Sequence, residues 1–198
     1  MRPVSLTVVV TTLLFCSATW VSAKPVSLNL LGRSQAGLYT LIPSEDESRW
    51  LRNKGTLVLG TSAPDYAPFD ISTGSDYYEG ISADYAGLLS QLLKIEVHVS
   101  RYPTRPEAIE ALKKGEIDML ATSNAYEQEA PQLTFSTRYV IDTPLLVRRI
   151  DKPDISGPEG GRLAMLYHYQ PADRVKKIYP NAQLQLYEST LGALSAVT

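Results

Sequence analysis

The sequence is poor in the residues that metal sites and nucleophilic catalysis use most often. Its 198 residues include one cysteine and two histidines. The cysteine, Cys16, has no second cysteine to pair with, so the chain cannot form an internal disulfide. His98 and His168 are not in a zinc-binding spacing such as HExxH, and we expect them on an exposed strand face and in a loop. We therefore expect no metal, no cofactor and no catalytic residue, and a fold held together by core packing.

The chain also lacks a strong charge of either sign. Its formal net charge is -2, and its lysines and arginines are scattered along the sequence. Proteins that bind nucleic acids concentrate basic residues on one face, so we exclude nucleic acid as a partner. The hydrophobic content of 44% is sufficient for a buried core.

A long apolar run is absent as well. The apolar segment at residues 6–15 is shorter than the roughly 20 residues that a membrane-spanning helix needs. It follows Arg2 and precedes a small-residue ending at Ala23. This order is typical of a signal peptide over residues 1–23, removed after Ala23, although an uncleaved anchor is the alternative. The sequence therefore predicts export.

Residues 77–118 alternate between helix and strand. A helix is predicted from Ser82, its expected N-cap, with one apolar face formed by Ile81, Tyr85, Leu88, Leu89, Leu92 and Leu93. Residues 95–100 alternate apolar and polar side chains, which is typical of a half-buried strand. A second helix runs from Thr104 to Gly115, with Pro106 in its first turn, and a strand follows at residues 117–121. This repeat predicts an α/β fold with a parallel sheet and right-handed crossovers.

The flanking segments complete a first lobe. We expect residues 24–55 to form an irregular lead-in, with at most one short strand, and a short helix capped by Ser44. Trp50 and Leu51 are its predicted buried anchors. Lobe 1 is then predicted over residues 56–150, with strands at 56–61, 133–136 and 139–148.

A second lobe is predicted after an exposed connection at residues 151–161, which is rich in proline, glycine and acidic residues. Residues 162–198 repeat the strand–helix–strand pattern, with a last helix capped by Ser189. The apolar pattern of this helix is still running at Thr198, so we expect a truncated second lobe and a longer natural protein.

Two loops at the carboxyl ends of strands are candidates for binding, since ligands of open α/β sheets lie there. The first loop carries Asp65, Tyr66 and Phe69, and the second carries Ser123 and Asn124. Each loop has a structural alternative. Phe69 could fill the core, and Ser123 or Asn124 could cap the turn that follows.

Several motifs, taken in order, resemble the bacterial solute-binding proteins of family 3. They are a Gly-Thr strand, a Pro-Phe loop, EGISADYAGLLSQLL, EAIEALKKGEIDML, a T-x-S strand and a P-L-L-V strand. The resemblance covers roughly residues 50–198. Within the family, the chain resembles the first periplasmic flytrap domain of BvgS/EvgS-type hybrid sensor histidine kinases, through residues 49–51, residues 80–85 and the run at 163–194 with YPNAQLQLY and ALSAV.

The resemblance implies a type II, periplasmic-binding-protein-like Venus flytrap of two lobes. It also implies a sensory role in the periplasm, with a second flytrap domain and a kinase anchored to the inner membrane in the same longer chain, and it leaves a homodimer open. Amino-acid-binding members carry an arginine after the strand that corresponds to residues 118–123, which clamps the ligand carboxylate. Here residues 126–130 contain none, and bulky Tyr167 and Tyr169 replace small residues in the second lobe. A free α-amino acid is therefore a poor candidate for the small-molecule ligand.

Two other functions stay open at this stage. A free solute-binding protein of an ABC importer fits the export signal and the flytrap pattern equally well. An enzyme with a flytrap fold would use some of the acids at Asp65, Asp70, Asp84, Glu127 and Glu129. No partner for such chemistry is recognisable, so we expect these acids to be solvated at the surface.

Overall fold

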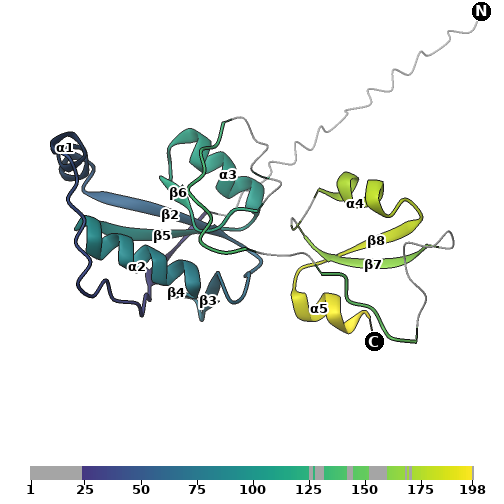
Figure 1. Ribbon diagram of the computed structural model, residues 1–198. Coiled ribbons are helices and arrows are strands. Elements are labelled where there is room, and N and C mark those ends of the chain that lie inside the picture. Colours follow the sequence, from purple (N-terminus) through teal and green to yellow (C-terminus); the bar gives the residue numbers. More distant parts are fainter. Residues whose placement is uncertain are drawn as a thin grey trace, which may run out of the picture.

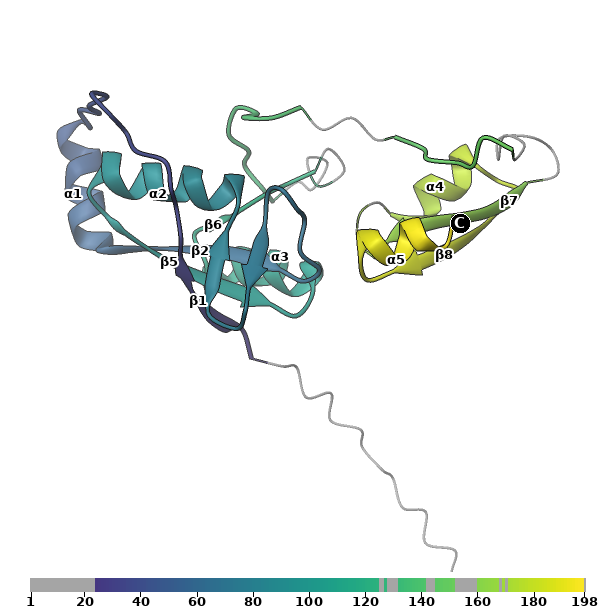
Figure 2. The same ribbon diagram turned by 90° about the horizontal axis from the view of Figure 1, so that it is seen from below.

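The computed structural model describes residues 24–124, 127, 132–141, 145–151, 160–167, 169 and 171–197. The predicted signal peptide, His168 and Glu129 lie outside these residues. The described chain forms two lobes (Figure 1), and the segment that includes residues 132–141 and 145–151 passes from one lobe to the other (Figure 2). Within the described part, no helix is both long enough and apolar enough to cross a membrane.

The first lobe is built on a six-stranded sheet with the order β3-β4-β1-β5-β2-β6. Its strands are β1 (Val26–Leu30), β2 (Thr56–Ser62), β3 (Ile71–Thr73), β4 (Tyr77–Glu79), β5 (Glu96–Tyr102) and β6 (Met119–Leu120). β2 pairs in parallel with β5 and β6, as predicted. The sheet is nevertheless mixed, because the lead-in strand β1 inserts between β4 and β5 and runs antiparallel to β5.

Helices α2 (Ile81–Leu93) and α3 (Arg105–Lys114) cover opposite faces of this sheet (Figure 1). The predictions for α3 and β5 are confirmed. Thr104 caps α3 by accepting a hydrogen bond from the backbone of Glu107, and Gly115 ends the helix in a left-handed conformation. In β5, Val97 and Val99 are buried, while Glu96 and His98, which alternate with them, are exposed.

The predicted N-cap of α2 is wrong, and the predicted buried face is wrong for Tyr85 and Leu89, although Leu93 does pack against the core. Gly80 is the N-cap, at φ 110°, and no side chain caps the helix. Backbone carbonyls of the preceding loop replace the cap, because Pro68 and Phe69 accept hydrogen bonds from Ile81 and Ser82 at 3.1 Å. The loop thereby turns small residues toward the sheet. Ser82, Ala83 and Ala86 are buried, whereas Tyr85 and Leu89 are exposed.

Two further predictions in the first lobe are corrected. Helix α1 (Glu45–Lys54) has the expected capping box between Ser44 and Glu47, but Trp50 is 55% exposed and only Leu51 packs against the core. The described residues at 132–141 and 145–151 form no strand. None of these described residues pairs with either sheet, and Tyr139 instead contacts the first lobe, where its hydroxyl donates to the Ala121 carbonyl at 3.2 Å and its ring centroid lies 4.6 Å from that of Tyr85.

The second lobe has the predicted strand–helix–strand order. Strands β7 (Gly161–Leu166) and β8 (Ala182–Tyr187) pair in parallel, with α4 (Ala172–Ile178) and α5 (Thr190–Ser195) on opposite sides (Figure 1). Ser189 caps α5, as expected. Leu163, Met165 and Val175 form a small core of their own.

Candidate binding cleft

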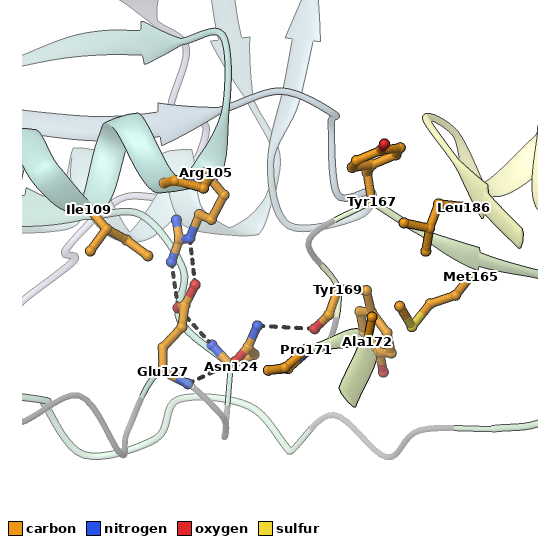
Figure 3. A pocket seen from close by; sticks show the side chains of 11 residues that line it. Arg105, Ile109, Asn124, Glu127, Met165, Tyr167, Tyr169, Pro171, Ala172 and Leu186 are labelled. Atoms are coloured by element: carbon orange, nitrogen blue, oxygen red, sulfur yellow. Dashed lines mark hydrogen bonds and ion pairs between the residues drawn. The ribbon is translucent and has the colours of Figure 1, made fainter. Parts of the chain in front are cut away.

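A cleft of about 380 Å³ lies between the two lobes (Figure 3). The first lobe contributes Arg105, Pro106, Ile109, Asn124 and Glu127, and the second contributes Met165, Tyr167, Tyr169, Pro171, Ala172 and Leu186. Most of these side chains are apolar or aromatic. Arg105 and Glu127 are the two charged residues among the described ones that line the cleft.

The strands explain why these residues meet. Arg105 follows the carboxyl end of β5, and Asn124 and Glu127 follow that of β6. Tyr167 and Tyr169 follow the carboxyl end of β7 in the other lobe. Both lobes therefore present to the cleft the end of the sheet at which open α/β folds bind ligands.

Arg105 and Glu127 form a bidentate ion pair in the wall of the cleft (Figure 3). Arg105 Nε donates to Glu127 Oε1 and Nη2 donates to Oε2, each at 2.7 Å. The side chains are only 13% and 12% exposed. Burial raises the pKa of Glu127, but the hydrogen bonds and the charge of Arg105 outweigh burial and hold this pKa below its ordinary value. Glu127 is therefore charged at neutral pH.

Sequence reasoning did not identify this pair, although two local signals were available. Arg105 lies in the first turn of α3, where the helix dipole disfavours a cation and an external anion is needed. Asn124 and Glu127 have the spacing of a capping box. Although residues 126–130 contain no arginine, a guanidinium does reach the cleft from α3, and it is already paired with Glu127.

Asn124 both caps a turn and lines the cleft. Its Oδ1 accepts a hydrogen bond from the Glu127 backbone at 3.1 Å, and its own backbone N–H donates to Glu127 Oε2 at 3.2 Å. Its Nδ2 donates to the Tyr169 carbonyl at 3.3 Å, which is a direct contact between the lobes. Ser123, by contrast, is exposed and donates to the Asn124 carbonyl at 3.4 Å.

The loop after β2 is used for internal contacts. Asp65 accepts hydrogen bonds from Arg101 Nη2 at 3.0 Å and from the Ser72 backbone at 2.8 Å. The rings of Tyr66 and Phe69 stack on each other with centroids 5.4 Å apart. No described residue that lines the cleft comes from this loop.

Of the seven predicted site residues, the cleft thus brings together Asn124, Tyr167 and Tyr169. The other four, Asp65, Tyr66, Phe69 and Ser123, are placed outside its lining. Contact of any of the seven with a ligand stays a prediction.

A buried polar network lies behind the cleft. Asp70 is 5% exposed and accepts hydrogen bonds from the Tyr78 hydroxyl and, at 2.6 Å, from Thr122 Oγ1. Burial and the charge of Asp70 raise the pKa of Tyr78 far above its ordinary value. The Thr122 carbonyl in turn accepts a hydrogen bond from Arg105 Nη2. The expectation of solvated acids is therefore wrong for Asp70 and Glu127.

No cluster of three or more histidine, cysteine, aspartate or glutamate side chains able to hold a metal ion occurs in the part of the chain that the structure describes. The described residues that line the cleft instead offer one ion pair, one side-chain amide and two phenols as polar groups. These groups suit the recognition of an organic molecule.

The two lobes, their parallel strand pairs and the cleft between strand ends define a Venus-flytrap binding fold. The model of the bacterial extracellular solute-binding proteins, family 3, matches residues 57–196, and the chain belongs to this family. Members of this class are binding proteins rather than catalysts.

Two BvgS comparisons extend the similarity beyond the family. The virulence sensor protein BvgS of Bordetella parapertussis is 36% identical over 191 residues, which cover 93% of this chain and 15% of that protein. The crystal structure of the BvgS periplasmic domain of B. pertussis superposes with a TM-score of 0.67 at 34% identity, covering 87% of this chain and 34% of that one. This chain is thus homologous to a periplasmic sensor domain, and it spans about 15% of the length of the curated BvgS relatives.

A solved ancestral amino-acid-binding protein, AncCDT-1, shares the fold. Its TM-score is 0.56 at 22% identity, and the match covers 76% of this chain and 69% of that protein. At this identity the similarity concerns the fold alone.

Proposed function

We propose that this chain is a periplasmic sensing domain of a two-component sensor kinase, and that the cleft between its lobes is the sensory site. The observation that carries the proposal is the 36% identity to the sensor protein BvgS over 191 residues. The same identity favours sensing over delivery of a solute to an importer.

The proposed mechanism is a shift between arrangements of the two lobes. A ligand that contacts both walls of the cleft stabilises the arrangement in which the walls are close, and it can shift the equilibrium only by its difference in affinity for the two states. The Asn124–Tyr169 hydrogen bond already joins the walls at one point. It supports the view that small changes in the cleft alter how the lobes are held.

The remaining parts of the proposal concern the longer protein. Because this chain spans about 15% of its BvgS relatives, we infer a second flytrap domain, a membrane anchor and the kinase elsewhere in the same chain. Export by the signal peptide at residues 1–23 would place the sensing domain in the periplasm. Association of two such chains is compatible with this arrangement.

A disulfide across the cleft tests the proposal. Residues 24–198 contain no cysteine, so Asn124→Cys with Tyr169→Cys introduces the only two thiols of this domain, at a point where the lobes touch. Oxidation should hold the lobes together and make phosphorylation of the response regulator insensitive to the stimulus, and a reducing agent should restore the response.

Each single cysteine variant is the matched control, because it carries one of the two substitutions but cannot form the cross-link, and its response should be the same under oxidising and reducing conditions. The measurement uses membranes that contain the protein as its gene encodes it, with a gel assay for free thiols. Complete cross-linking without any change in phosphorylation would refute the cleft as the sensory site.

A further inference from the structure

We propose that Glu127 is an internal carboxylate that occupies Arg105, and that it thereby makes the cleft reject ligands which carry a carboxylate. Glu127 is then a specificity-determining residue of the site. This inference rests on the proposed function only in taking the cleft to be the ligand site.

The geometry of the pair is the one that a ligand carboxylate would adopt. A guanidinium binds a carboxylate best through two parallel N–H···O bonds, and Arg105 makes both of them to Glu127, at 2.7 Å each. Its Nη2 also donates to the Thr122 carbonyl. The Nε–Nη2 edge of Arg105, which binds a carboxylate through two N–H groups, is therefore fully engaged.

Two hydrogen bonds with Asn124 hold Glu127 in this position. Asn124 accepts a hydrogen bond from the Glu127 N–H, and its backbone N–H donates to the Glu127 carboxylate. A tethered group competes at a high effective concentration, so a free carboxylate in solution is displaced by it. A ligand that succeeded would also leave the charge of Glu127, whose side chain is 12% exposed, without its cationic partner.

The other described residues of the cleft offer no second cation. Arg105 is the only lysine, arginine or histidine among them, and Met165, Tyr167, Tyr169 and Leu186 give the opposite wall an apolar and aromatic character. We infer that the cleft accepts an uncharged molecule with a flat or apolar face, because such a molecule packs against these side chains without needing Arg105.

The test removes the internal carboxylate and offers an external one. In Glu127→Ala, the vacated space lies beside Arg105, so acetate should bind there and stabilise the protein. We expect a saturable rise in melting temperature, roughly 3 to 6 °C at ten times the dissociation constant. The unmodified protein should show no rise, and Arg105→Ala in the Glu127→Ala background should abolish it.

A surface ion pair provides the matched control. Glu79→Ala also frees an arginine, since Glu79 pairs with Arg33, whose side chain is 72% exposed outside the cleft. Acetate should leave the melting temperature of this variant unchanged. An equal response of Glu79→Ala and Glu127→Ala, or acetate binding by the unmodified protein, would overturn the inference.

A second variant covers the case in which Glu127→Ala does not fold. Glu127→Gln keeps the shape of the side chain but removes its charge, and in equilibrium dialysis it should bind radiolabelled acetate more tightly than the unmodified protein. No binding to either variant would also overturn the inference. Because these measurements do not involve signalling, they can succeed where the disulfide experiment fails, and the two failures are distinguishable.

Discussion

The hydrogen bond from Tyr78 to Asp70 leads to a stability prediction whose size follows from the structure. Tyr78→Phe removes one hydroxyl from a side chain with 0% exposure and leaves the ring in the core. Among the described residues, the Asp70 carboxylate then keeps the bond from Thr122 and loses the one from the Tyr78 hydroxyl. Hydrogen bonds to charged groups contribute about 1.5 to 3 kcal/mol, so we expect the free energy of unfolding to fall by about 2 kcal/mol.

The assay is equilibrium unfolding in urea, where this change should lower the midpoint by roughly 1 M. Tyr77→Phe is the control, because Tyr77 precedes Tyr78 in β4 and is 48% exposed. Its effect should stay within about 0.5 kcal/mol. If Tyr78→Phe changed the free energy of unfolding no more than Tyr77→Phe does, the buried hydrogen bond would not carry the stability assigned to it.

Three further predictions concern the ends of elements and the cleft. The folded-state pKa of Glu127 lies below the unfolded value of 4.5, so its contribution to stability is complete above pH 4.5 and is lost as the pH falls through the folded-state pKa. Melting temperatures between about pH 6 and pH 3 should therefore fall less steeply in Glu127→Gln than in the unmodified protein. Gly80→Ala should cost more than about 1 kcal/mol in urea unfolding, because φ is 110° there and a Cβ would collide with loop carbonyls; an equal effect of Gly74→Ala, at an open position with φ 63°, would mean that the collision is irrelevant. Thr104→Ala should cost about 1 kcal/mol by removing the cap of α3, and unchanged unfolding would contradict a stabilising cap.

The parts of the fold that could be predicted are those with local signals. The alternation in β5 and the cap, proline and terminal glycine of α3 each fix a conformation through neighbouring residues. The buried face of α2 could not be predicted in this way. It depends on Gly80 and on the carbonyls of Pro68 and Phe69, which start the helix so that Ser82, Ala83 and Ala86 are buried while Tyr85 and Leu89 are exposed.

Tertiary pairing explains the other differences. Nothing in residues 26–30 signals that β1 will insert between β4 and β5, because the register depends on partners about 50 and 70 residues away. Trp50 is predicted to be buried, but among the described residues of α1 only Leu51 is packed against the core.

The same limit applies to the candidate site. Strand ends indicated Asn124, Tyr167 and Tyr169, since topology places the carboxyl ends of strands at one edge. Arg105 and Glu127 are 22 residues apart and separated by two loops, so no pattern of apolar and polar residues in the sequence indicates that they pair. A search for a carboxylate clamp after β6 therefore misses the cation that α3 supplies.

This pairing changes what the absence of a clamp means for recognition. A cleft without any cation would be indifferent to carboxylates, whereas a cleft whose cation is held by an internal carboxylate opposes them, because binding must first break a buried bidentate pair. Through Thr122, Arg105 is also joined to the buried Asp70, so displacing Glu127 would disturb a network that reaches the core of the first lobe. In the proposal, the cation among the described residues of the cleft is therefore part of the protein's own structure, and discrimination among ligands is assigned to the aromatic wall of the second lobe.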